Sequence, residues 1–269
     1  MTSTQYDEIG KDDASLTKPA NIGDYDATYA NWSWDDVTAE LDLPDGLVNL
    51  AHECIDRHAN GDRATKDAMI WHGPSGEEER YTYVDMKAQS NKVANALTEL
   101  GINKGDRVFI LADRIPELYF TMFGGLKIGA VMAPLFAAFG PEPIKERVDR
   151  AEGRVIVTVP KLLPKVNDIR SQLPSVEHVI VIDSRDDAAV ADEDIAFSSI
   201  VDGASEDFDI VPTSEDDWSI MHFTSGTTGL PKGAAHVHGA VAGYYATGKY
   251  VHDMQEDDIY WCTADPGWV

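Results

Sequence analysis

The chain has 269 residues, of which 43% are hydrophobic, so it can bury a sizeable core in one large domain or two smaller ones. It carries 47 Asp and Glu against 22 Lys and Arg, which gives a formal net charge of -25 and a pI of about 4.4. With this charge we expect neither nucleic acid nor anionic membrane surfaces as partners, because both would repel the protein. The acidic residues are typical of a solvated, halophile-like surface suited to a high-salt cytoplasm, and a basic protein partner is the alternative interpretation.

The cysteines and the N-terminal residues indicate the compartment. Cys54 and Cys262 lie far apart without the CxxC spacing of a zinc site, and two such residues make no disulfide framework. Residues 1–13 are polar and acidic, unlike a signal peptide, and no apolar run approaches the length that spans a membrane. We therefore expect a cytoplasmic protein.

The first part of the chain begins with residues 1–20, whose polar composition predicts disorder. Apolar residues at helical spacing predict a helix over 46–59. Residues 67–86 contain two strand-like runs around a turn at 73–76, which predicts a hairpin. A long amphipathic helix follows, with Thr82 as its expected N-cap and Gly101 at its end.

Short apolar runs then alternate with helical patterns. The predicted strands are 107–112, 130–135, 154–159, 178–183 and 218–223, and the predicted helices between the first four are 116–129, 141–153 and a broken one at 161–173. Runs rich in β-branched residues that alternate with helices are typical of a parallel sheet buried on both faces. The sequence therefore predicts an α/β fold built of parallel-sheet layers.

One stretch has the composition of a phosphate-binding loop. The last predicted strand runs directly into "TSGTTGLPKG", residues 224–233, which combines three glycines, four hydroxyl side chains and Lys232. Glycines let the backbone approach a ligand closely, and successive N–H groups can then converge on an anion. A plain surface turn is the alternative. A Walker P-loop is excluded by spacing, because Pro231 stands where its second glycine belongs and Gly233 replaces the Ser or Thr.

The motif "FTSGTTGLPKG" resembles the phosphate-binding signature of AMP-forming adenylating enzymes, a superfamily that includes acyl-CoA synthetases, luciferases and peptide-synthetase adenylation domains. The segment "DDIYWCTADPGWV" (257–269) is similar to acetyl-CoA synthetases in particular. So are "KGDRVFILADRIPELYF", "KIGAVMAPLF" and "YDATYANWSW" further upstream. The resemblance covers roughly residues 24–269.

The resemblance implies a two-step reaction of acetate with ATP, accompanied by Mg²⁺, and then with coenzyme A. Carried over to this sequence, the residues that hold the ATP phosphates are Thr224, Ser225, Gly226, Thr227, Thr228, Gly229 and Lys232. Lys232 is expected to stabilise charge rather than act as a base. Trp268 resembles a residue near the acyl and coenzyme A pocket, and an ordinary core or surface Trp is the alternative.

Other residues permit more than one interpretation. His236 and His238 form an HxH pair that is more often packing than metal-binding, and no metal site is expected. Lys161 and Lys165 fall near the place of an arginine-rich coenzyme A contact in longer family members, and we expect them to be solvated surface charges. The side chain of Arg114 is expected to face either the active side or a neighbouring carboxylate, and Asp265 is interpreted as structural.

The resemblance also implies that the chain is an N-terminal portion of a longer ligase. The expected organisation is a polar segment 1–20, an acetyl-CoA-synthetase-like segment 21–80, and an incomplete adenylation domain 81–269. Since the family places its adenine pocket and a further catalytic lysine later in the chain, we expect little or no ligase activity from these 269 residues alone. A ligase for propionate or a longer acid is one alternative, and a non-catalytic chain that binds nucleotide or a partner is another. The oligomeric state is left open.

Overall fold

The computed structural model describes residues 18–44, 47–185, 189–224 and 229–268. The chain forms two compact units. The first unit consists of residues 1–40 and 242–261, and the second of residues 41–241 and 262–269. Both units therefore combine segments that are far apart in the sequence. The predicted boundaries at residues 20 and 80 stay a prediction.

The first unit is helical and joins an early segment of the chain to a late one. Its elements are α1 (Tyr25–Asn31), α2 (Trp34–Ala39), most of α9 (Val241–Ala246) and the π-helix η5 (Thr247–Val251). The backbone N–H of Asn21 donates to Asp253 at 2.7 Å. Lys249 and Tyr245 both donate to the carboxylate of Glu40 at 2.6 Å, and these hydrogen bonds lower the pKa of Glu40. Polar contacts thus hold the two segments together.

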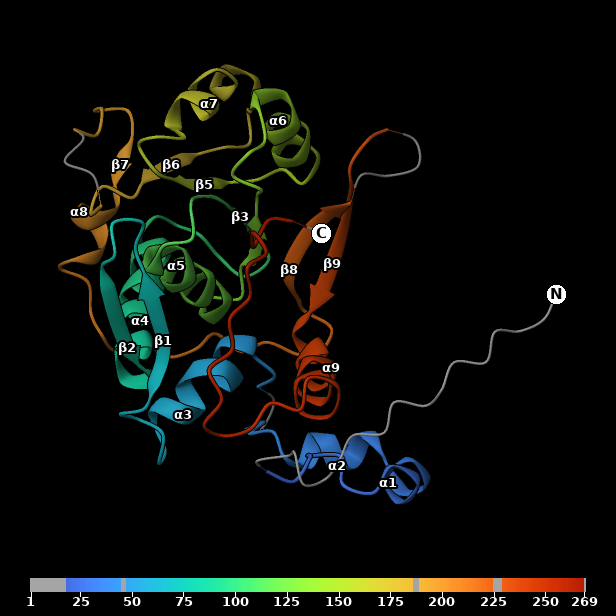
Figure 1. The fold of residues 1–269 in the computed structure, drawn as a ribbon. Coiled ribbons are helices and arrows are strands. Elements are labelled where there is room, and N and C mark those ends of the chain that lie inside the picture. Colours follow the sequence, from blue (N-terminus) through green and yellow to red (C-terminus); the bar gives the residue numbers. More distant parts are fainter. Residues whose placement is uncertain (1–17, 45–46, 186–188, 225–228, 269) are drawn as a thin grey trace. The chain divides into compact units, whose positions relative to one another are not determined.

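The second unit is built on a seven-stranded sheet in the order β7-β6-β5-β3-β4-β8-β9 (Figure 1). The strands are β3 (Arg107–Leu111), β4 (Val131–Pro134), β5 (Val155–Thr158), β6 (His178–Val181), β7 (Ile195–Ala196), β8 (Trp218–Thr224) and β9 (Lys232–Val237). All neighbours are parallel except β8 and β9. The expectation of a mostly parallel α/β sheet is confirmed.

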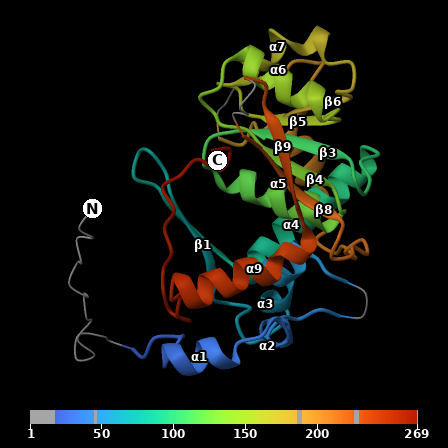
Figure 2. The ribbon, with the colours of Figure 1, turned by 90° about the vertical axis from the view of Figure 1, so that its right-hand side faces the viewer.

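Helices cover both faces of this sheet. Figures 1 and 2 show α4 (Tyr83–Glu99) and α5 (Pro116–Lys127) on one side, and α6 (Pro141–Arg150) and α7 (Leu163–Asn167) on the other. The strand order explains this arrangement. The crossover from β3 to β4 and the crossover from β4 back to β5 run in opposite directions, so right-handed connections place α5 and α6 on opposite faces. Strands β4 and β5 are therefore fully buried.

A separate hairpin of β1 (Asp67–His72) and β2 (Glu78–Thr82) belongs to the same unit. Arg185 fastens it to α5. Its guanidinium donates to Glu79 at 2.6 and 2.9 Å and to Glu117 at 2.9 and 3.0 Å, and it lies 4.5 Å from the ring centre of Trp71. Two carboxylates around one arginine are favourable in this acidic chain, because their mutual repulsion is offset by a shared cation.

Most predicted elements are observed, and the capping of α4 is confirmed in detail. Thr82 and Asp85 form a reciprocal capping box, and Gly101 has a φ of 80° just beyond the helix. The helix expected over 46–59 is present only in part and includes a π-helical turn. The remaining short elements are η2 (His52–Asp56), α3 (Arg57–Ala59), η3 (Arg170–Gln172), α8 (Phe197–Val201) and η4 (His238–Ala240). Strand β9 was not predicted.

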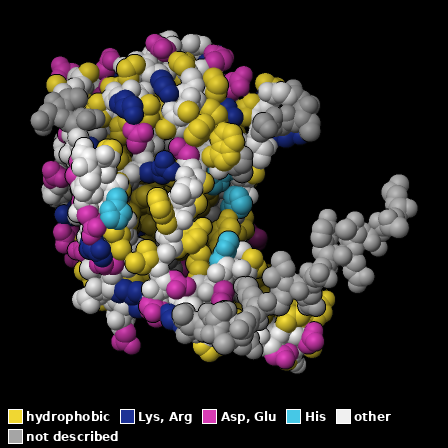
Figure 3. Space-filling view, in the orientation of Figure 1, with side chains coloured by type: hydrophobic (Ala, Val, Ile, Leu, Met, Phe, Trp, Pro, Cys, Tyr) yellow, Lys and Arg dark blue, Asp and Glu magenta, His cyan; other side chains and the backbone are white. Residues whose placement is uncertain are grey.

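The surface has no single acidic patch on the face shown in Figure 3, where Asp and Glu are dispersed among cationic, apolar and other side chains. Among the described residues, none of the helices combines the length and apolarity that crossing a membrane requires. The two cysteines are free and exposed.

Candidate functional site

The predicted phosphate loop connects β8 to β9. Thr224 ends β8 and Lys232 begins β9, and the antiparallel register places these two residues directly opposite each other. Both are exposed, and Gly229 between them has a φ of 85°, a conformation that favours glycine. The structure therefore brings the predicted hydroxyl and the predicted lysine to the same end of the hairpin.

The four central residues of the predicted loop, Ser225, Gly226, Thr227 and Thr228, lie outside the described residues. The strand that leads into them is nevertheless well defined. Phe223 is buried, and β8 pairs with the fully buried β4 on its other side. Since β8 is parallel to β4, the loop begins at the carboxyl edge of the sheet, where ligands of open α/β sheets bind.

Residues 262–268 cross this same edge, and we call them the C-terminal strap. Arg114, which follows β3, donates to the carbonyl oxygen of Thr263 at 2.5 Å. His222 of β8 lies 3.1 Å from the carbonyl oxygen of Pro266. The strap thus joins the ends of strands that are separated by β4 in the sheet. The partner of Arg114 is a carbonyl group rather than a carboxylate.

Gly267 fits against the backbone that follows β4. A Cβ atom at this position would lie 2.1 Å from the carbonyl carbon of Leu135 and 2.2 Å from the nitrogen of Phe136. The Asp265 carboxylate accepts a hydrogen bond from the Gly267 N–H at 2.8 Å, which supports the structural role expected for Asp265. Only glycine permits this approach, because the contacts are with backbone atoms that cannot rotate away.

Trp268 is 62% exposed and packs edge-to-face on Phe136, with ring centres 5.1 Å apart. It is therefore a surface residue with one aromatic partner rather than a core residue. Because the strap also contacts β8, Trp268 is joined through described contacts to the strand that carries Thr224. Its predicted role near the acyl and coenzyme A pocket stays a prediction.

The two residues of the HxH pair have different surroundings. His238 is fully buried, and its Nδ1 accepts the backbone N–H of Leu50 at 3.1 Å. Burial lowers the pKa of His238 to about 4, and its Nε2 is buried without a hydrogen-bond partner. His236 lies 6.0 Å from the ring of His222. Among the described residues there is no group of three or more His, Cys, Asp and Glu side chains that could hold a metal ion.

A buried arginine lies near β8, the strand that leads into the predicted loop. Arg147 of α6 is buried, with its guanidinium 4.2 Å from the ring centre of Phe139 and 5.9 Å from that of Phe223. It donates to the carbonyl oxygen of Pro143 at 2.8 Å, and it forms no ion pair within the described part of the chain. Burial lowers the pKa of the Arg147 guanidinium. Sequence reasoning missed this residue, because its position on α6 carries no motif.

Lys161 and Lys165 lie in different environments. The side chain of Lys161 is 72% exposed and lies 3.6 Å from Asp113, which agrees with a solvated surface charge. Lys165 is half-buried, and its Nζ donates to the carbonyl oxygen of Ala137 at 2.8 Å. Lys165 is thus a surface charge that is only partly exposed, because its side chain spans the gap to the loop after β4.

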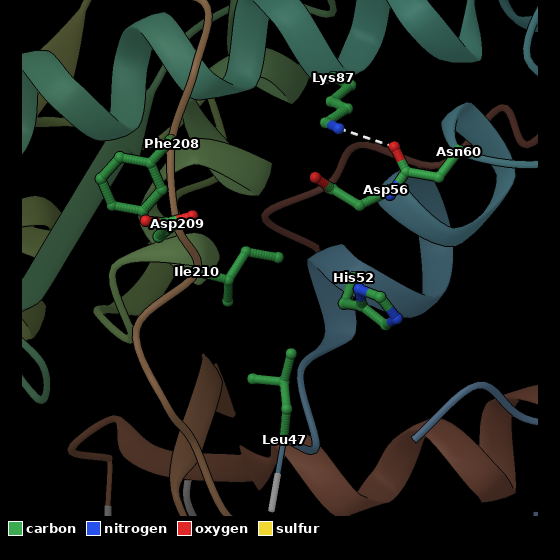
Figure 4. A pocket seen from close by; sticks show the side chains of 8 residues that line it. All are labelled: Leu47, His52, Asp56, Asn60, Lys87, Phe208, Asp209 and Ile210. Carbon is green, nitrogen blue, oxygen red and sulfur yellow. Dashed lines mark hydrogen bonds between the residues drawn. The ribbon is translucent and has the colours of Figure 1, made fainter. Parts of the chain in front are cut away.

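A cavity of about 340 Å³ lies elsewhere in the second unit, and Figure 4 shows its lining. His52, Asp56 and Lys87 are among its polar residues, and the Nζ of Lys87 donates to Asn60 at 2.7 Å. The apolar side chain of Ile210 extends toward these residues from the opposite wall. Among the predicted site residues that the structure describes, none lines this cavity, so it is distinct from the edge where β8 and the strap meet.

Known proteins resemble this chain in both sequence and fold. A family model described as AMP-binding enzyme matches residues 55–269. Acetyl-coenzyme A synthetase of Bacillus subtilis is 41% identical over 251 residues, which cover 93% of this chain and 43% of that protein. Acetyl-coenzyme A synthetase of Methanothrix thermoacetophila is 34% identical, over 98% of this chain and 41% of its own length. The chain thus spans less than half the length of these curated relatives.

Solved structures give the same result for the fold. An acyl-CoA synthetase of Brucella canis superposes with a TM-score of 0.82 at 31% identity, covering 91% of this chain and 43% of that chain. An anthranilate CoA ligase in complex with anthranoyl-AMP superposes with a TM-score of 0.66 at 25% identity, covering 77% of this chain and 36% of that chain.

Proposed function

The chain belongs to the family of AMP-binding enzymes, and on this basis we propose that it acts in an AMP-forming ligase that joins acetate to coenzyme A. The observation that carries the proposal is the pairing of Thr224 with Lys232 at the carboxyl edge of the sheet. This pairing brings together the two ends of the glycine-rich segment, and the same strand β8 contacts the strap through His222. The relatives named acetyl-coenzyme A synthetase support acetate as the acid.

In the proposed first step, a carboxylate oxygen of acetate attacks the α-phosphorus of ATP. The bond from that phosphorus to the bridging oxygen breaks, and diphosphate leaves. Both reactants are anions, so the protein has to orient them and stabilise the charge on the leaving group. We assign the β- and γ-phosphates to Thr224, Ser225, Gly226, Thr227, Thr228, Gly229 and Lys232. Mg²⁺ accompanies ATP, and the exposed Thr224 hydroxyl is an oxygen donor of the kind that this ion prefers.

In the proposed second step, the thiol sulfur of coenzyme A attacks the carbonyl carbon of the acetyl-adenylate. The thiol proton is released, the bond to the phosphate oxygen breaks, and AMP leaves. We assign Trp268 to the acyl or coenzyme A side of the site, because the strap holds it at the edge where the loop begins. The proposed location of the protein is the cytoplasm.

The test is an exchange assay that follows the incorporation of labelled diphosphate into ATP. It is run with acetate, propionate, butyrate and octanoate, on the protein purified from its source cells and on the 269-residue chain. We expect acetate-dependent exchange in the first preparation and little in the second. Faster exchange with propionate or a longer acid would replace acetate as the substrate. A folded source protein that binds ATP but shows no acid-dependent exchange would instead favour a non-catalytic binding chain.

A further inference from the structure

His222 makes a hydrogen bond that joins the loop strand to the C-terminal strap. Its Nε2 lies 3.1 Å from the carbonyl oxygen of Pro266, 44 residues along the chain. A carbonyl oxygen only accepts, so the Nε2 of His222 carries the hydrogen in this contact. Burial lowers the pKa of His222, which favours the neutral ring with Nε2 protonated and Nδ1 bare. The contact is therefore a neutral hydrogen bond with a defined tautomer.

The position of His222 on β8 gives this contact its importance. Side chains alternate along a strand, so His222 and Thr224 point to the same face of β8. At the other end of the bond, Pro266 is two residues before Trp268. A single hydrogen bond thus lies two residues from the start of the phosphate loop and two residues from the aromatic residue of the strap.

The other contacts of the strap lead to other strands. Arg114 holds Thr263 beside the end of β3, and Gly267 and Trp268 contact the backbone and the ring of residues that follow β4. Among the described residues, His222 provides the side-chain hydrogen bond that joins the strap to β8. Removing it would keep the contacts of the strap with the residues after β3 and β4 and would remove its hydrogen bond to the loop strand.

We propose that His222 is a positioning residue that sets the place of Trp268 relative to β8, the strand that leads into the phosphate loop. This inference rests on the proposed function, in which the loop holds ATP and the strap serves coenzyme A. Through the carbonyl of Pro266, His222 acts on coenzyme A binding without touching the reacting atoms. Loss of the hydrogen bond affects the second half-reaction more than the first, because the loop strand keeps its pairing with β4 and β9.

The experiment compares His222→Leu with His222→Gln, since the Gln amide nitrogen replaces the Nε2 donor. In the source protein, we expect His222→Leu to raise the KM for coenzyme A about tenfold while the KM for ATP stays within about twofold, in line with the loss of one neutral hydrogen bond. His222→Gln should restore most of the loss. The matched control is His178→Leu on β6, which removes a contact of 3.2 Å between the ring and the carbonyl oxygen of Leu100 at the end of α4. It should leave both KM values unchanged.

A second measurement does not depend on activity. The indole N–H resonance of Trp268, assigned in the source protein through Trp268→Phe, should move in His222→Leu and return in His222→Gln. An unmoved resonance, or equal increases in both KM values, would overturn the role of His222. If wild-type protein shows no exchange while the resonance responds as expected, the proposed function fails and the positioning of Trp268 by His222 stands.

Discussion

Thr224 and Lys232 face each other across β8 and β9, so the exposed start and end of the glycine-rich loop occupy adjacent positions of one hairpin. The pairing of β9 with β8 fixes the backbone position of Lys232, although its side chain is long. The hairpin thus supplies a cation whose backbone position is set before any ligand arrives, and such preorganisation makes charge stabilisation effective.

Lys232→Ala should therefore lower the rate of acetyl-adenylate formation by about 100-fold, as expected when one preorganised charge contact to the leaving group is lost. The measurement is acetate-dependent diphosphate exchange in the source protein. Lys145→Ala is the control, because Lys145 lies on α6 and pairs with Glu142 on the same helix. An unchanged exchange rate in Lys232→Ala would remove the role assigned to this lysine.

Lys127 should prove important for stability. Its ammonium is fully buried, at 2.8 Å from Asp56 and 2.7 Å from Asn91, and burial lowers its pKa. Lys127→Ala leaves the Asp56 carboxylate buried without its cation, which should cost about 3–5 kcal/mol in the free energy of unfolding. Denaturant titration of the chain measures this loss. Combining Lys127→Met with Asp56→Asn should recover much of it, and a loss no larger than that of Lys145→Ala would contradict the prediction.

Gly267→Ala should displace the strap, because its Cβ would overlap the backbone of Leu135 and Phe136. We expect loss of the packing of Trp268 on Phe136, observed as a change in the near-ultraviolet circular dichroism of the aromatic residues. The matched control is Gly203→Ala, since nothing lies within 4 Å of a Cβ atom at Gly203. Spectra that change equally in both variants would show that the close approach of Gly267 has no special role.

His238 should contribute to acid sensitivity. Its pKa is about 4 in the folded chain, below the ordinary value of 6.5. Above pH 6.5 the ring is neutral in both states. Between pH 6.5 and 4 only the unfolded chain takes up the proton, so stability falls as the pH falls, by about 3 kcal/mol in total. His238→Asn retains an acceptor for the Leu50 N–H without this titration. Urea unfolding at pH 7 and pH 4.5 should show a smaller difference in the variant, and an identical difference would refute the assignment.

The sequence predicted the sheet well, because its buried strands are continuous apolar runs. Strand β9 was missed for a physical reason. It lies at the sheet edge, where Gly233, Ala234 and Ala235 are exposed, and such small residues carry neither an apolar run nor an alternation. Pairing with β8 determines this strand, and that information lies in tertiary structure rather than in local pattern.

The sequence motif names the residues at the two ends of the candidate loop, but it does not reveal the contacts that hold the neighbouring segments in place. Thr224, Gly229 and Lys232 follow from the motif, whereas the contact of His222 with Pro266 links a side chain to a backbone carbonyl far along the chain. Backbone acceptors have no residue identity, so no sequence pattern reveals such a bond. No local pattern indicates that Gly267 meets the backbone after β4.

Because β9 is exposed at the edge of the sheet, added salt should have two opposing effects on the protein in solution. Among the described residues, β9 pairs with β8 alone, so its outer edge can template pairing between copies of the chain. At low ionic strength the net charge of -25 keeps copies apart, although repulsion between like charges also destabilises each folded chain. Added salt relieves the internal repulsion and weakens the barrier between molecules at the same time. Colloidal stability and conformational stability should therefore reach their maxima at different salt concentrations.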